Sequence, residues 1–171
     1  KHGAALVYAV EVGFGQLAGS LSQDARVVNL ERTNLGDEKL LSLSPVPTLG
    51  SVDLSYLSLE KAVPQFRAVL HGHGELVCLV KPLFEVDDAQ ARRTGQMDPS
   101  AYAPLLRRLA DALDAQPDTH VAAVAHSHVT GNHGTHEFFF HVRLGVPGER
   151  LTDAAIDQAV ASALALPRYR K

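Results

Sequence analysis

The sequence has little of several features that would assign a protein to a special class. It contains one cysteine, Cys78, so no disulfide can form within the chain and a reducing compartment such as the cytoplasm fits best. No apolar run reaches the length needed to span a membrane, and no signal-peptide pattern is present. The net charge of −3 excludes a general binder of polyanions. We therefore expect a cytoplasmic protein without membrane contact, in which any contact with nucleic acid comes from local patches or a neighbouring domain.

Methionine is equally scarce, because Met97 is the only one in the chain. A translated chain begins with methionine, so we expect the complete protein to extend upstream of Lys1. The 171 residues present have the length of one domain, and 46% of them are hydrophobic. That composition is enough to bury a sizeable core.

The stretch GELVCLVKPLFE, residues 74–85, organises the rest of the chain. Residues 75–80 form a short continuous apolar run, which predicts a fully buried parallel strand. The run stops at Lys81, and Pro82 favours an extended backbone in the residue before it. We therefore expect Lys81 to project from the C-terminal end of the strand, where open α/β sheets bind ligands. A lysine partly removed from water at that edge loses its proton more easily.

Strands and helices alternate along the remaining chain. We predict strands at 4–12, 26–30, 51–55, 120–125 and 136–144, helices at 16–23, 57–70, 101–114 and 151–166, and loops at 40–50, 87–95 and 127–135. The aromatic residues of 136–144 favour an antiparallel strand near the sheet edge. This alternation predicts an α/β fold with a mostly parallel sheet and an antiparallel last strand.

The first candidate site is the turn after the first strand, where Glu11 is followed by Gly13 and Gly15. An acid at a strand end can accept hydrogen bonds from the two hydroxyls of a ribose, and glycines let the backbone approach a ligand. The residues are equally compatible with nucleoside binding and with a plain strand-to-helix turn.

The second candidate site combines Asp53, Lys81 and Glu137, all of which fall at predicted strand ends. A site assembled from several strands has such long spacing, and two carboxylates could hold an ammonium group in place. Whether the lysine acts neutral or charged depends on the balance between desolvation and the paired acids. The alternative is a structural ion pair.

The third candidate is a group of histidines, the commonest metal-binding side chain. Its members are His120, His126, His128, His133, His136 and His141. They occupy two strands and a loop without a tight ligand pattern, so exposure on a loop is the simpler explanation and no metal site is predicted. Arginine pairs at 92–93 and 107–108 and the basic tail at 168–171 indicate solvated faces that could contact phosphates.

Five sequence blocks together resemble the FtsJ-type RNA 2′-O-methyltransferases, and most closely their hemolysin A (TlyA) branch. The blocks are VYAVEVGFGQL, VVNLERTN, SVDLSYLSLEKAVP, GELVCLVKPLFE and HVTGNHGTHEFFFHVRL. They follow one another in order from Ala5 to Leu144. The pairing of VKP-x-FE with the acid-Val-Gly-x-Gly-Gln-Leu block makes the resemblance specific.

The resemblance implies a Rossmann-like fold that binds S-adenosyl-L-methionine and transfers its methyl group to a ribose 2′-hydroxyl of ribosomal RNA. It implies that Asp53, Lys81 and Glu137 are the last three members of a catalytic Lys-Asp-Lys-Glu tetrad. It also implies that the cofactor is bound by a second set of residues, comprising Glu11, Val12, Gly13, Asn34 and Asp53. The partner would be ribosomal RNA or a ribosomal subunit, and association into a homodimer is compatible with it.

The chain also departs from the family pattern. The family's first strand, its glycine-rich cofactor loop and the first tetrad lysine would all precede Ala5, as would a small RNA-binding domain. Without that strand, the sheet would be interrupted between residues 5–12 and 51–55. Glu11 stands where the branch has aspartate, and the loop after Glu85 keeps only Gly95 of a glycine-rich run.

We therefore expect an N-terminally incomplete methyltransferase domain over residues 1–150, followed by a C-terminal helix and basic tail over 151–171. The alternative is a catalytically inactive methyltransferase-fold module that associates with RNA or protein. A third hypothesis, a metal-dependent hydrolase built on the histidines, has less support.

Overall fold

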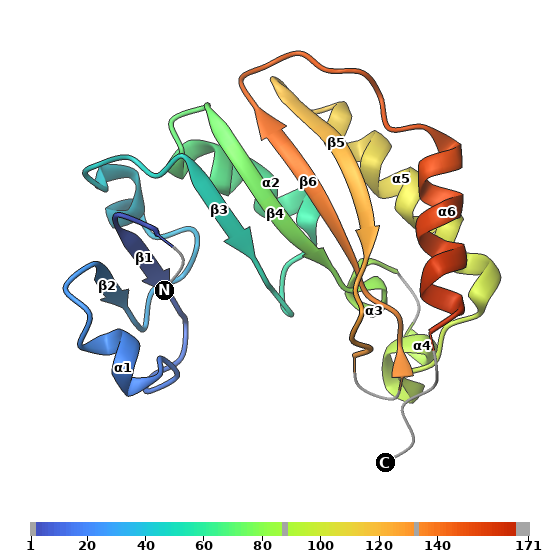
Figure 1. Cartoon of the computed structure of the whole chain (residues 1–171), viewed down its shortest axis with the longest axis horizontal. Coiled ribbons are helices and arrows are strands. Elements are labelled where there is room, and N and C mark those ends of the chain that lie inside the picture. Colours follow the sequence, from blue (N-terminus) through green and yellow to red (C-terminus); the bar gives the residue numbers. More distant parts are fainter. Residues whose placement is uncertain (1–2, 87–88, 132–133, 167–171) are drawn as a thin grey trace. The chain divides into compact units, whose positions relative to one another are not determined.

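The computed structural model describes residues 3–86, 89–131 and 134–166 and divides the chain into two compact units, Lys1–Ser42 and Leu43–Lys171 (Figure 1). Each unit contains its own sheet. This division agrees with the interruption of the sheet that the resemblance predicts. None of the helices among the described residues is long and apolar enough to cross a membrane.

Unit 1 contains a two-stranded parallel sheet of β1 (Val7–Val10) and β2 (Val27–Leu30). Both strands are shorter than predicted. The helix predicted at 16–23 is also shorter, because α1 covers only Gly19–Ser22. Gly15 explains the late start of the helix: its φ of +69° is left-handed, and its N–H donates to the Glu31 carboxylate at 2.8 Å. A 3₁₀ helix, η1, follows at Glu38–Ser42 in a region predicted to begin a loop.

Unit 2 contains a four-stranded sheet in the order β3-β4-β6-β5. The strands are β3 (Leu49–Val52), β4 (Gly74–Val80), β5 (Thr119–His126) and β6 (Phe138–Leu144). β3 is parallel to β4, and β6 is antiparallel to both β4 and β5. Three strands therefore run in one direction and the last runs against them, which confirms the predicted fold class.

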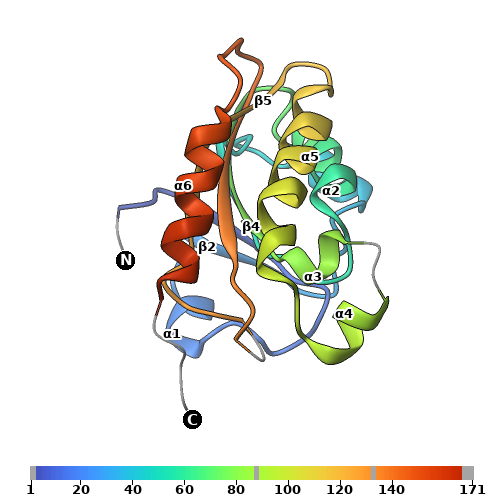
Figure 2. The same cartoon turned by 90° about the vertical axis from the view of Figure 1, so that its right-hand side faces the viewer.

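Helices α2 and α5 pack on one face of this sheet, and α6 lies beside the edge strand β5, next to α5, as Figures 1 and 2 show. The helices of unit 2 are α2 (Leu59–Val69), α3 (Pro82–Glu85), α4 (Ala89–Thr94), η2 (Pro99–Ala101), α5 (Tyr102–Asp114) and α6 (Asp153–Leu164). Polar side chains cap the N-termini of two of these helices. The Asp98 carboxylate accepts the Ser100 N–H at 2.8 Å before η2, and the Thr152 hydroxyl accepts the Ala155 N–H at 3.3 Å before α6.

The prediction that 75–80 is buried on both faces is wrong. Alternate residues of β4 point to opposite faces, so Leu76 and Cys78 are buried while Val77 is 42% exposed. The sheet is packed on the face that carries Leu76 and Cys78, whereas the face that carries Val77 is open to solvent. Cys78 is a core residue, since it has no exposed surface.

The prediction that 87–95 is a plain loop is also wrong, because α4 occupies most of it. Ala91 supplies the buried side of this short helix, and Thr94 donates its hydroxyl to the Gln90 carbonyl at 2.9 Å. Gly95, with a φ of +67°, ends the helix in the left-handed conformation that glycine adopts without strain. Residues 87–88 lie outside the described part of the chain.

Candidate active site

Three predicted site residues meet at one edge of the unit 2 sheet. Val80 of β4 pairs with Phe138 of β6, so the next position on each strand brings Lys81 opposite Glu137. β3 ends one residue before Asp53, whose Oδ1 lies 2.5 Å from the Nζ of Lys81. The prediction that these strand ends come together is therefore confirmed.

Lys81 is held by its backbone as well as by its partner. It has the extended backbone that Pro82 favours, with φ −105° and ψ 97°, and it immediately precedes α3. Its carbonyl accepts the N–H of Phe84 at 2.9 Å. Its side chain is 21% exposed, whereas that of Asp53 is 64% exposed. An ion pair this open to water adds little to stability, so its clearest effect is to place the ammonium group.

Burial raises the pKa of the Glu137 carboxyl; the charge of Lys81 lowers it, and the charge of Asp53 raises it further. The net result is a pKa raised above the ordinary value of a glutamate. The ammonium group of Lys81 contacts the Asp53 carboxylate directly, and Glu137 lies close enough to be affected by both charges.

The segment that carries Glu137 is fastened to its surroundings on both sides. Its carbonyl accepts the N–H of Ser127 at 2.8 Å. The buried Thr135 hydroxyl donates to the carbonyl of Gly95 at 2.9 Å, which ties this loop to the end of α4. The N–H of His136 lies 3.4 Å from the hydroxyl of Tyr102 in α5. These contacts fix the backbone from which the Glu137 side chain extends.

Sequence reasoning missed Glu85, which ends the KPLFE block. Its carboxylate accepts the N–H of Leu59 at 2.9 Å, at the start of α2, and its carbonyl accepts from the Arg108 guanidinium at 2.8 Å. Burial raises the pKa of Glu85 despite the hydrogen bond from Leu59. The only sequence signal was an acid at the end of an apolar block, and its hydrogen-bond partner Leu59 lies 26 residues away in the sequence.

The remaining predicted residues lie in unit 1, at the ends of β1 and β2. Glu11 follows β1, and its Oε1 accepts the N–H of Gly13 at 2.7 Å. The carbonyl of Gly13 accepts the N–H of Arg32, and the carbonyl of Glu11 accepts that of Thr33, both at 3.0 Å. These bonds hold the turn after β1 against the segment that leads to Asn34.

Asn34 uses its side-chain oxygen to accept the Gly36 N–H at 3.1 Å. Val12 is 49% exposed in the same turn as Glu11. Unit 1 therefore presents a carboxylate, a glycine-containing turn and an amide at its strand ends. This is a set of groups that can accept hydrogen bonds from ribose hydroxyls and contact a base.

The candidate histidines that the structure describes are not gathered into a metal centre. Among the residues that the structure describes, no three His, Cys, Asp or Glu side chains are placed to hold a metal ion. Instead, His126 and His128 contact each other at 4.7 Å between ring centroids, and His141 contacts the Glu75 carboxylate at 3.0 Å. His133 and the basic tail at 168–171 lie outside the described residues.

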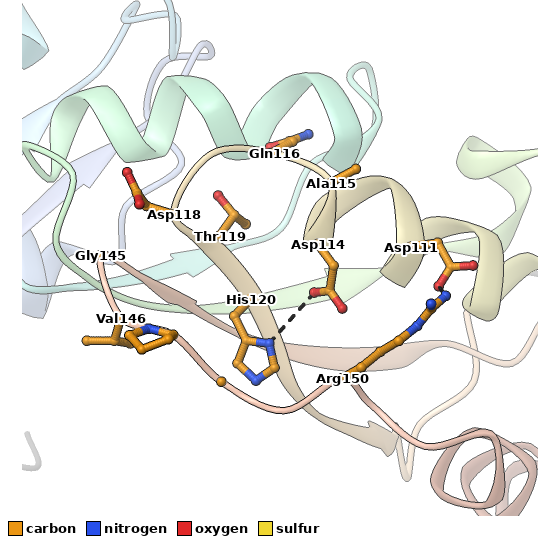
Figure 3. A pocket seen from close by; sticks show the side chains of 12 residues that line it. Asp111, Asp114, Ala115, Gln116, Asp118, Thr119, His120, Gly145, Val146 and Arg150 are labelled. Carbon is orange, nitrogen blue, oxygen red and sulfur yellow. Dashed lines mark hydrogen bonds and ion pairs between the residues drawn. The ribbon is translucent and has the colours of Figure 1, made fainter.

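A cavity of about 630 Å³ opens at the other end of β5, beside Thr119 and His120 (Figure 3). Figure 3 shows His120 directed towards Asp114, with 3.9 Å between Nδ1 and Oδ1. The three carboxylates lining this cavity already have partners, namely Arg150 for Asp111, the Val121 N–H for Asp114 and Arg67 for Asp118. We therefore place the candidate active site at Lys81 and not at this cavity.

Comparison with known proteins adds family information to this geometry. The sequence model described as FtsJ-like methyltransferase matches residues 1–144. YqxC of Bacillus subtilis is named as an rRNA methyltransferase. It is 32% identical to this chain over 168 residues, which cover 95% of this chain and 59% of YqxC.

The 16S/23S rRNA (cytidine-2′-O)-methyltransferase TlyA of Mycobacterium tuberculosis is 38% identical over 143 residues, covering 82% of this chain and 53% of its own length. A solved structure named as a hemolysin from Streptococcus thermophilus matches with a TM-score of 0.83 and 32% sequence identity. The match covers 95% of this chain and 59% of the chain in that structure. The chain thus spans little more than half the length of the relatives it matches.

Proposed function

The chain belongs to the FtsJ-like methyltransferase family, and we propose from this that the complete protein transfers a methyl group from S-adenosyl-L-methionine to a ribose 2′-hydroxyl of ribosomal RNA. The observation that carries the proposal is the meeting of Asp53, Lys81 and Glu137 at one strand edge. The name of TlyA, which describes 2′-O transfer to rRNA in that relative, supports the same reaction class.

The residues of unit 1 fit the cofactor by the chemistry of their donors and acceptors. One oxygen of Glu11 is oriented by the Gly13 N–H, and a carboxylate so oriented can accept hydrogen bonds from ribose hydroxyls. A Cβ added at Gly13 would lie 3.2 Å from that oxygen, so the turn is close-fitting. We assign Glu11, Val12, Gly13 and Asn34 of unit 1 to cofactor binding.

S-adenosyl-L-methionine, when bound, supplies an electrophilic methyl group on its sulfonium. The contribution of this chain is to prepare the acceptor. A ribose hydroxyl is a poor nucleophile, so it must be oriented and relieved of its proton. Lys81 orients the hydroxyl: as a neutral amine it would accept that proton, and as an ammonium group it would only steer it, while Asp53 and Glu137 hold the lysine. The 2′-hydroxyl as acceptor would distinguish RNA from DNA.

The test uses the complete protein and its Lys81→Ala variant. We expect calorimetric titration with S-adenosyl-L-methionine to show binding for both, and methyl transfer to ribosomal RNA for the wild-type protein alone. General acid–base groups contribute roughly 10²–10⁴-fold to a rate, so the variant should lose at least about 10²-fold.

Two other results would change the conclusion. No heat at millimolar cofactor would remove the enzymatic proposal and favour a non-catalytic module that associates with RNA or protein. Loss of cofactor affinity and transfer together in Lys81→Ala would instead assign the lysine a role in folding.

A further inference from the structure

A glycine in the loop between β5 and β6 contacts the carboxylate of Glu137. The N–H of Gly131 donates to the Thr135 carbonyl at 2.8 Å, and the carbonyl of Gly131 accepts the Gly134 N–H at 3.2 Å. These two hydrogen bonds hold Gly131, which lies beside the end of the Glu137 side chain.

The absence of a side chain at Gly131 is what makes this contact possible. A Cβ added there would lie 2.6 Å from Oε1 of Glu137 and 3.1 Å from its Cδ. Ordinary contact requires about 3.4 Å, so a methyl group would displace the carboxylate by about 0.8 Å. The backbone of Gly131 does not require glycine, because its φ lies outside the left-handed region.

A methyl group at position 131 would collide with the Glu137 carboxylate, and we expect this collision to affect activity more than stability. The nearest atoms belong to the far end of a flexible, partly exposed side chain, which can swing away at little cost to the fold. A displacement of about 1 Å in a reacting arrangement, by contrast, can cost about 10²-fold in rate. Gly131 therefore has the features of a residue retained for geometry and not for folding.

We propose that Gly131 is a positioning residue that sets where the Glu137 carboxylate lies relative to Lys81. This inference rests on the proposed function, in which Glu137 holds the lysine that acts on the ribose hydroxyl. It adds a residue that decides the position of the carboxylate by which Glu137 holds the lysine. Thr135 holds the backbone of Gly131 in place, because the Thr135 carbonyl accepts the Gly131 N–H.

The first measurement compares Gly131→Ala with Gly19→Ala in the complete protein. A Cβ at Gly19 meets nothing within 4 Å and the backbone there is ordinary, so this variant controls for the substitution itself. We expect Gly131→Ala to lower kcat by about 10²-fold. The temperature of unfolding and the affinity for S-adenosyl-L-methionine should stay at wild-type values. Gly19→Ala should retain wild-type kcat, and equal loss in both variants would overturn the proposal.

The second measurement is a double-mutant cycle with Glu137→Asp. The aspartate carboxylate ends one bond earlier, so the added methyl group at position 131 no longer displaces it by the same amount. We expect Gly131→Ala to cost much less in the Glu137→Asp background than in the wild-type background, a non-additivity typical of residues in contact. Additive losses would overturn the proposal.

A third measurement does not depend on catalysis. Titration of the residue 137 carboxyl by ¹³C NMR should show a pKa closer to the ordinary glutamate value in Gly131→Ala, because the displaced group moves towards water. If the wild-type protein transferred no methyl group, the proposed function would fail. The titration would still decide whether Gly131 sets the position of Glu137, and an unchanged titration curve would overturn that idea.

Discussion

The carboxylate of Glu85 accepts a hydrogen bond from the backbone N–H of Leu59 at 2.9 Å, which joins the segment after Lys81 to the segment after Asp53. Glu85 ends α3, and Leu59 begins α2. The two strand ends that supply the Lys81–Asp53 pair are therefore connected a second time, a few residues further along each chain segment. Such a connection holds the backbone of both residues and makes their 2.5 Å contact less dependent on the ion pair itself.

Replacing Glu85 should reveal this connection. Glu85→Ala leaves the N–H of Leu59, a residue that is 2% exposed, without its acceptor, which costs about 1–3 kcal/mol of unfolding free energy. We expect the variant to lower methyl transfer as well, because α2 and α3 are no longer held together. Urea denaturation and a transfer assay would measure the two effects. Wild-type stability in Glu85→Ala would contradict the role assigned to the bond.

The pH dependence of stability offers a control with Glu85→Gln. Burial raises the pKa of Glu85 in the folded protein, so the protonated form is the one that folding favours. Its contribution to stability is complete below the unfolded pKa and is lost as pH rises through the higher folded pKa. Glutamine keeps an oxygen acceptor without the charge. We expect Glu85→Gln to lack this decline and to match or exceed wild-type stability at pH 7.

The sequence was sufficient to predict the strand ends of the site but not the contacts that support them. Lys81 follows a short apolar run and Asp53 lies in a stretch predicted as a strand at 51–55, and the ends of parallel strands in an α/β sheet meet at one edge. The partner of Glu85 could not be predicted, because a side chain to backbone contact over 26 residues leaves no local pattern.

The two errors about unit 2 have physical explanations of the same kind. Residues 75–80 are apolar throughout, so their pattern does not show that Val77 lies on an open face. That exposure depends on which elements cover each face of the sheet, and a local apolar pattern does not show this. The helix α4 was missed because six residues with one buried alanine are too short to show a helical period.

The hydrogen bond from the Thr135 hydroxyl to the Gly95 carbonyl provides a further prediction. Thr135→Val keeps nearly the same side-chain shape but replaces the hydroxyl with a methyl group. The Gly95 carbonyl then loses this donor, which costs about 1–3 kcal/mol of unfolding free energy. Because the bond fastens the loop before Glu137, we expect methyl transfer to fall too. Thr94→Val is a matched control, since it removes an exposed hydroxyl bonded within α4. Equal effects of the two variants on transfer would contradict the prediction.

Cys78 should be chemically silent in the folded protein. It has no exposed surface, and burial, with a smaller contribution from Glu85, raises its pKa to about 12. The reactive form of a cysteine is the thiolate, which is scarce at pH 8 under these conditions. We expect a disulfide reagent to label the native protein at the rate of unfolding and the denatured protein at once. Rapid stoichiometric labelling of the native protein would show that β4 is less well covered than the structure indicates.

Two acids of unit 1 allow the cofactor role of Glu11 to be separated from the folding of its loop. The Glu11 carboxylate accepts the Gly13 N–H at 2.7 Å, and the Glu31 carboxylate accepts the Gly15 N–H at 2.8 Å, so each holds the same turn. Only Glu11 is assigned to the ribose of S-adenosyl-L-methionine. Charged acceptors contribute about 1.5–3 kcal/mol to a hydrogen bond, so Glu11→Gln should weaken cofactor binding by roughly 10- to 100-fold in calorimetry. Glu31→Gln should leave the dissociation constant unchanged, whereas similar losses in both variants would mean that the carboxylates act through the shape of the turn.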